Sequence, residues 1–193
     1  MSIYGIGTAG YPMAGYEPRK TERSNAGSSY TNQMSSVTQT SQMPGGAFEL
    51  HISNDTDGEA ISAACGSDYS MTVYQPNDFD PANPVYKVKV WDKEGNVTER
   101  MVDVSKVDPG SSDYIEMFAY TSHLSSSGEY SDAQSVFTRA AANQHGVDGI
   151  GYGDLFGKTD WFSVVRDAMQ MQFDAKNLEG YLEYKRFLDF LEK

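Results

Sequence analysis

The chain has 193 residues, with 15 Lys or Arg against 27 Asp or Glu, so its formal net charge is −12 at pH 7. An acidic chain is repelled by the phosphates of nucleic acids and by anionic membranes, so we expect neither of them as a partner. We expect the partner to be a protein. Cys65 is the single cysteine, which excludes an intrachain disulfide and any metal site built from several cysteines. We expect no cofactor.

The N-terminal segment 1–46 is predicted to be a disordered polar tail. Its part 24–46 contains not one charged residue, and such small, polar sequence buries too little apolar surface to offset the entropy lost on ordering. Tyr4, Tyr11 and Tyr16 lie among glycines near the start and are the candidate contacts for a protein partner. The alternative is a flexible tail whose tyrosines have no role.

The segment 85–104 is predicted to form a β-hairpin. Side chains of a strand point to opposite faces with a period of two, which places Tyr86, Val88 and Val90 together on one face. Between the two strands, Gly95 can adopt the positive φ that a type I turn with a bulge requires. Two strands alone bury too little surface to be stable, so other elements must cover the valine-rich face.

A single folded domain is expected over 47–193. Alternation of apolar and polar residues predicts two further strands, near 47–52 and 70–74. The segment 60–65 suits either a strand or half a helical turn, and the sequence does not decide between them.

After the hairpin the period of the apolar residues changes from 2 to about 3.6, which predicts helices. Four helix starts are expected, near Asp113, Ser131, Thr159 and Asn177. Ser131 and Gln134 have the spacing of a capping box, in which each side chain satisfies a backbone N–H of the other residue. Strands followed by helices indicate an α+β fold, a small antiparallel sheet packed by about four C-terminal helices.

A glycine-rich loop at 146–158 suggests an alternative function, that of a small hydrolase or transferase. The loop ends in the Gly-Lys-Thr sequence of a phosphate-binding loop. That motif has four residues between its first glycine and its Gly-Lys pair, whereas here five residues separate Gly151 from that pair and three separate Gly153 from it. The enzyme hypothesis requires Asp154 and Lys158 to converge in a concave pocket, whereas the other interpretation is an ordinary loop and helix cap. The candidate residues of this site are Gly151, Gly153, Asp154, Lys158 and Thr159.

No metal site is predicted, because His51, His123 and His145 lie in separate elements without metal-binding spacing. No stretch approaches the roughly 18 apolar residues of a membrane-spanning helix. The N-terminus lacks the basic residues and apolar run of a secretory signal. We therefore expect a cytoplasmic protein, with non-classical export as the alternative.

The opening MSIYGIGTAGYP and the closing segments MQMQF (169–173) and YKRFLDFLE (184–192) resemble uncharacterised proteins of anaerobic, gut-type Firmicutes. The resemblance covers the whole chain and implies a bacterial origin, but it brings no activity and no site residues. The function expected from the sequence is that of a non-catalytic interaction protein with a flexible N-terminal docking or export tail.

Overall fold

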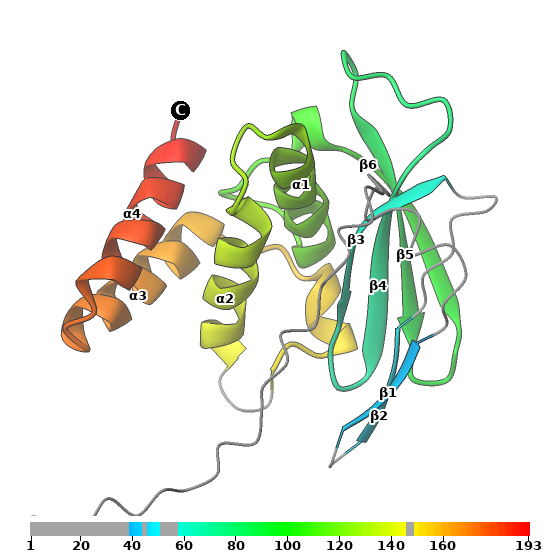
Figure 1. Cartoon of the computed structure of the whole chain (residues 1–193), viewed down its shortest axis with the longest axis horizontal. Helices are drawn as coiled ribbons and strands as arrows, with labels where there is room; N and C mark the ends of the chain where they lie inside the picture. The colour runs from blue at the N-terminus through cyan, green and yellow to red at the C-terminus, as the bar shows by residue number, and fades with distance from the viewer. Residues whose placement is uncertain (1–38, 44–45, 51–57, 146–148) are drawn as a thin grey trace, which may run out of the picture.

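The computed structural model shows an antiparallel sheet followed by four helices (Figure 1), which confirms the α+β fold. It describes residues 39–43, 46–50, 58–145 and 149–193. The sheet contains β3 (Glu59–Cys65), β4 (Tyr69–Gln75), β5 (Val85–Asp92) and β6 (Val97–Asp103), hydrogen-bonded in chain order. The helices are α1 (Tyr114–Ser127), α2 (Ala133–His145), α3 (Trp161–Asp174) and α4 (Leu178–Leu191). Two short 3-10 helices are η2 (Val104–Lys106) and η4 (Tyr152–Phe156).

The elements form successive layers. Helix α1 lies against one face of the sheet, α2 packs on α1, and α3 and α4 form an antiparallel pair that packs on α2 (Figure 1). Helix α4 therefore packs on its helical neighbours and lies at the end of the molecule opposite the sheet.

The predicted hairpin is present as β5 and β6. Tyr86, Val88 and Val90 are at most 1% exposed, and Gly95 has a φ of +83° in the turn. Strand β4 extends the same buried face, since Met71 and Val73 belong to one apolar core with these residues. Helix α1 adds Ile115, Met117, Phe118 and Ala119 to that core.

Local capping sets the start of three helices as predicted. Asp113 accepts the backbone N–H of Glu116, and the Glu116 carboxylate accepts that of Asp113, which completes a capping box before α1. Asp160 caps α3 and Asn177 caps α4, each through its side-chain oxygen.

Helix α2 begins differently from the prediction. Its Gln134 N–H donates to the Oγ of Ser125, at 3.1 Å, and not to the predicted Ser131. Ser125 belongs to the last turn of α1, so a neighbouring helix supplies the acceptor. The capping box predicted at Ser131 and Gln134 is wrong because a tertiary contact replaces the local one.

The strand predicted near 47–52 is present as β2 (Gly46–Leu50), but it pairs with β1 (Gln39–Met43) in a separate two-stranded sheet. The undecided segment 60–65 forms β3, the edge strand of the main sheet. Strand β1 falls within the tail predicted to be disordered. Strand pairing satisfies backbone hydrogen bonds whatever the side chains are, so a polar segment can pair with its neighbour. Tyr4, Tyr11 and Tyr16 lie outside the described residues.

Candidate functional site

The two charged residues of the predicted catalytic loop are held by different partners. The Asp154 carboxylate accepts the N–H of Gly151 at 2.9 Å and lies 3.6 Å from Nδ1 of His145. The Lys158 ammonium donates to Glu116 on α1 at 2.6 Å. The structure does not bring Asp154 and Lys158 to a common centre, which the enzyme hypothesis required.

Gly153 and Thr159 are further candidate residues of this loop. A Cβ on Gly153 would meet no atom within 4 Å, so no close backbone approach requires glycine there. The N–H of Thr159 donates to the Ser112 carbonyl at 2.9 Å, and the same carbonyl accepts the indole N–H of Trp161. The loop therefore joins the start of α1 to the start of α3. The helix start expected at Thr159 is one residue early, because Asp160 is the residue that caps α3.

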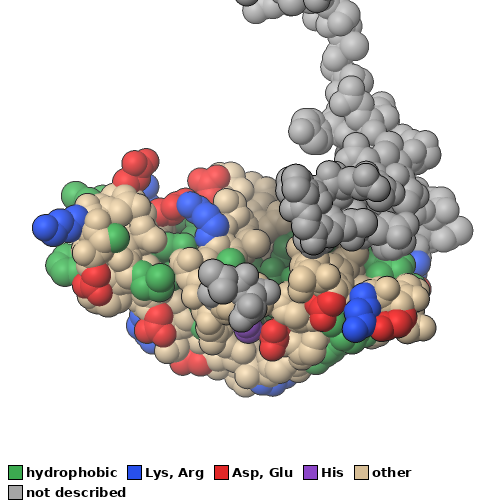
Figure 2. Space-filling view, turned by 90° about the horizontal axis from the view of Figure 1, so that it is seen from below, with side chains coloured by type: hydrophobic (Ala, Val, Ile, Leu, Met, Phe, Trp, Pro, Cys, Tyr) green, Lys and Arg blue, Asp and Glu red, His purple; other side chains and the backbone are tan. Residues whose placement is uncertain are grey.

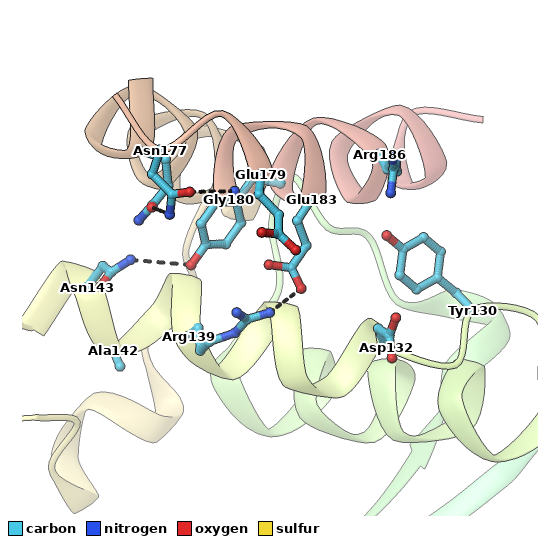
Figure 3. Close-up of a pocket in the computed structure, with 12 residues that line it drawn as sticks. Tyr130, Asp132, Arg139, Ala142, Asn143, Asn177, Glu179, Gly180, Glu183 and Arg186 are labelled. Carbon is cyan, nitrogen blue, oxygen red and sulfur yellow. Dashed lines mark hydrogen bonds and ion pairs between the residues drawn. The ribbon is translucent and has the colours of Figure 1, made fainter. Parts of the chain in front are cut away.

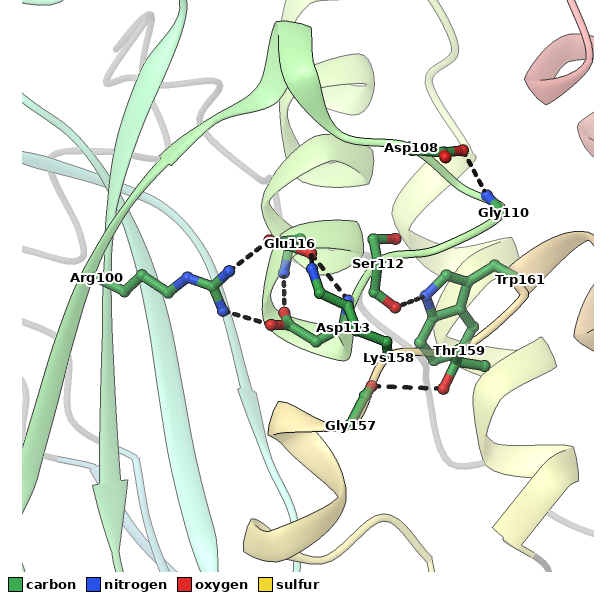
Figure 4. A network of polar contacts seen from close by, with 10 residues as sticks. All are labelled: Arg100, Asp108, Gly110, Ser112, Asp113, Glu116, Gly157, Lys158, Thr159 and Trp161. Carbon is green, nitrogen blue, oxygen red and sulfur yellow. Dashed lines mark hydrogen bonds and ion pairs between the residues drawn. The ribbon is translucent and has the colours of Figure 1, made fainter.

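A charged network connects the sheet edge to this loop (Figure 4). Arg100 on β6 donates to Asp113 and Glu116 at the start of α1, and Glu116 also accepts from Lys158. The Asp113 side chain is only 5% exposed, so these partners take the place of water around its carboxylate. The network stabilises the contact between sheet and helix and presents no unpaired reactive group.

Opposing effects act on the pKa of Glu116. Burial raises this pKa, but the bond from Lys158, the backbone N–H of Asp113 and the charge of Arg100 outweigh burial and hold it below its ordinary value. The carboxylate is therefore charged at neutral pH, and its ion pairs are intact there.

This lowered pKa predicts an acid-dependent loss of stability. A carboxylate whose pKa is lower in the folded state stabilises the protein above its unfolded pKa, and that stability is lost as the pH falls through the folded pKa. We expect the free energy of unfolding to fall below about pH 4.5, and less steeply in Glu116→Gln. Urea unfolding across this range measures the effect. In the control Glu94→Gln, in an exposed turn, the free energy of unfolding should depend on pH as in the wild type. The same wild-type dependence in Glu116→Gln would contradict the prediction.

A cleft of about 620 Å³ lies between α2 and α4 (Figure 3). Arg139 on α2 forms an ion pair with Glu183 on α4, and Nδ2 of Asn143 donates to the hydroxyl of Tyr184 at 3.4 Å. Burial raises the pKa of Tyr184, so its hydroxyl keeps its proton at neutral pH. Further charged and polar residues of the cleft are Tyr130, Asp132, Gln172, Asn177, Glu179 and Arg186.

Gly180 lies against a hydrogen bond in the wall of the cleft. A Cβ at this position would approach Nδ2 of Asn177 and Oε1 of Gln172 to 2.7 Å, and these two atoms form a hydrogen bond of 2.6 Å. The glycine therefore leaves room for the bond that joins the end of α3 to the start of α4.

An apolar hollow lies at the turn between α3 and α4, on the side of α4 away from the cleft. Phe173 and Leu178 are 62% and 66% exposed, and together with Tyr181 they line a hollow of about 460 Å³. We call these three residues the apolar end. Asp174 and Lys176 complete its wall. Figure 2 views the molecule from the side of this turn and shows apolar side chains separated by charged ones at its left-hand end.

The helix predicted to start near Asn177 carries the apolar residues Leu178 and Leu182 as well as Tyr184 and Phe187. At about 100° per residue, the two leucines lie on the side of the helix opposite Tyr184, Phe187 and Leu191, which are buried. A helical projection of the same residues would have separated the two faces. The sequence thus separates the two faces, and the packing of α4 on its neighbours decides which face stays exposed.

No family model, curated protein or solved structure matches the chain. In the described part of the chain, no helix is long and apolar enough to cross a membrane. The same residues contain no group of three or more His, Cys, Asp or Glu side chains placed to hold a metal ion.

Proposed function

We propose that the protein is a non-catalytic interaction protein that binds a partner protein through the apolar end of the α3–α4 pair. The observation that carries the proposal is the exposure of Phe173 and Leu178 beside a hollow that can accept a side chain. Burying a large apolar side chain contributes about 1.5–3 kcal/mol, so leaving two exposed forgoes stability that a partner could recover. Exposed apolar patches with a polar rim are typical of protein-binding surfaces.

The geometry of the turn supports preorganised binding. Lys176 has a φ of +58°, a left-handed conformation that costs a non-glycine residue about 1–2 kcal/mol. Two backbone hydrogen bonds hold the turn. The N–H of Lys176 donates to the Phe173 carbonyl at 2.9 Å, and the N–H of Asn177 donates to the Gln172 carbonyl. Phe173 and Leu178 thus flank a turn of defined shape, and a partner need not order it.

The test is co-purification from the native cell with the double variant Phe173→Ser, Leu178→Ser. We expect its recovery of the partner to fall about 100-fold, because two buried apolar contacts are lost. Phe156→Ser is the matched control, since Phe156 is also exposed but lies in η4, away from this turn. Control and wild type should recover the same partner. Equal recovery by the double variant would remove the apolar end from the proposal.

The N-terminal docking or export tail remains a second part of the proposal, and it is supported by the uncharged composition of 24–46 alone. A chain that starts at Gln39, the first residue of β1, belongs in the same comparison. Reduced recovery or altered localisation would support a role for the segment with Tyr4, Tyr11 and Tyr16. Unchanged recovery and localisation would eliminate it and leave the apolar end unaffected.

A further inference from the structure

Strand β6 is an edge strand with exposed apolar side chains. It pairs with β5 on one side, and no described strand lies on its other side. Val97 and Met101 are 48% and 55% exposed on the face of the sheet opposite α1. Trp91, opposite Val97 in the ladder, extends this row onto β5. An exposed edge of this kind is a template for another strand.

The register shows which backbone groups this edge offers. The N–H of Val104 donates to the Pro84 carbonyl, and that of Asp92 donates to the Asn96 carbonyl. In an antiparallel ladder the hydrogen-bonded pairs alternate, so the intervening bonds to β5 come from Thr98, Arg100 and Val102.

The residues between them direct their N–H and C=O groups away from β5. These residues are Val97, Glu99 and Met101. Their side chains also share one face of the strand. An incoming strand would therefore bond to these three backbones and pack beside these three side chains.

We propose that two copies of the chain associate by antiparallel pairing of their β6 edges about Glu99, which joins the two sheets into one. A two-fold axis through Glu99 places Val97 of each copy opposite Met101 of the other. Shifting the register by two residues instead places Val97 opposite Glu99 or opposite Asp103. Only the register centred on Glu99 therefore forms two apolar pairs, each worth about 0.2–1 kcal/mol.

The like charges that this register brings together are partly offset. Pairing about Glu99 brings the two Glu99 side chains together, and like charges directly opposite each other are destabilising. Each Glu99 is already paired within its own sheet, because Nζ of Lys89 lies 3.3 Å from its carboxylate. The four side chains then form a Lys-Glu-Glu-Lys row with no net charge.

This surface is independent of the apolar end. Strand β6 and the α3–α4 pair lie at opposite ends of the molecule (Figure 1), so self-association leaves the proposed partner site accessible. The inference does not rest on the proposed function, and either can fail without the other.

Disulfide trapping of the full chain tests the register. The background for these variants is Cys65→Ser, which removes the single native cysteine. In the proposed dimer, Glu99→Cys places one new thiol on each copy, and the Cα atoms of the two residues are about 5.5 Å apart, within disulfide range. We expect Glu99→Cys to form a covalent dimer on mild oxidation. A mixture of Val97→Cys and Met101→Cys chains should cross-link to each other. Glu94→Cys, in the turn of the same hairpin, should stay monomeric; cross-linking of Glu94→Cys as fast as Glu99→Cys would overturn the proposal.

Sedimentation velocity of the unmodified chain provides the second measurement. We expect a dimer that forms in a concentration-dependent way at protein concentrations up to about 1 mM. Met101→Lys should raise the dissociation constant of the dimer about ten-fold, because that change removes two apolar pairs. Glu99→Gln should strengthen the dimer because it removes the like-charge pair. A monomer at every concentration would overturn the proposal. The exposed side chains of Met101 and Glu99 contribute little to folding, and circular dichroism checks that both variants are folded.

Discussion

Phe137→Ala is expected to lower the free energy of unfolding by about 3–5 kcal/mol, the largest effect of any substitution discussed for this protein. Phe137 on α2 is fully buried, and its ring lies 5.2 Å from that of Tyr114 and 5.0 Å from that of Trp161, between centroids. These residues come from α1, α2 and α3, so the ring stands where three helices meet. Removing it opens a cavity that no single helix can close by moving alone.

Urea unfolding followed by circular dichroism measures this loss. Phe173→Ala is the matched control, because it deletes the same side chain from an exposed position at the end of α3, and its free energy of unfolding should stay within about 0.5 kcal/mol of wild type. A loss below about 1 kcal/mol in Phe137→Ala would mean that the three helices do not share the core described for them.

Arg100→Met is expected to lower the free energy of unfolding by about 2 kcal/mol. Arg100 is the residue of β6 that binds both Asp113 and Glu116, and without it the nearly buried Asp113 carboxylate loses its cation. The loss should be smaller than for a fully buried pair, because the Arg100 side chain is 34% exposed and water screens the change.

The control for this prediction is Arg166→Met. Arg166 also pairs with a glutamate, Glu192 at 2.7 Å, but both side chains are largely exposed, so the expected change is below about 0.5 kcal/mol. Thermal and urea unfolding of the two variants should therefore differ clearly. Equal effects would show that the network between β6 and α1 stabilises no more than a surface ion pair.

Self-association through β6 would also change how the partner site works. A two-fold dimer carries two apolar ends, one on each copy, and these face away from the shared sheet. Two linked sites bind a partner with repeated motifs more tightly than one site does, without any new contact. Partner binding at the apolar end and self-association through β6 are thus compatible, and each can be tested without the other.

Local sequence signals predicted most of the secondary structure. Asp113 with Glu116 and Asn177 set helix starts through bonds within a few residues, and these bonds form wherever the helix lies. The β5–β6 hairpin followed from its alternation and from Gly95, which depend only on neighbouring residues. Such features are independent of the rest of the chain, so a single sequence is enough to find them.

Long-range contacts explain the predictions that failed. Ser125 caps α2 from a different helix, nine positions before Gln134. Lys158 pairs with Glu116 across 42 positions, whereas Asp154 accepts a hydrogen bond within the predicted catalytic loop itself. Competing local motifs had suggested other partners for these residues, and only the packing of α1 against its neighbours selected among them.

By itself, the sequence determined the α+β class, the hairpin and the positions of the helices, because periodicity and capping act over short distances. The tertiary structure decided which strands share a sheet, which side of α4 is covered and which edge remains open. Those properties depend on what packs against each element. Leu178 and Met101 are apolar in any arrangement, but they became candidate contacts only because no described element covers them in the folded chain.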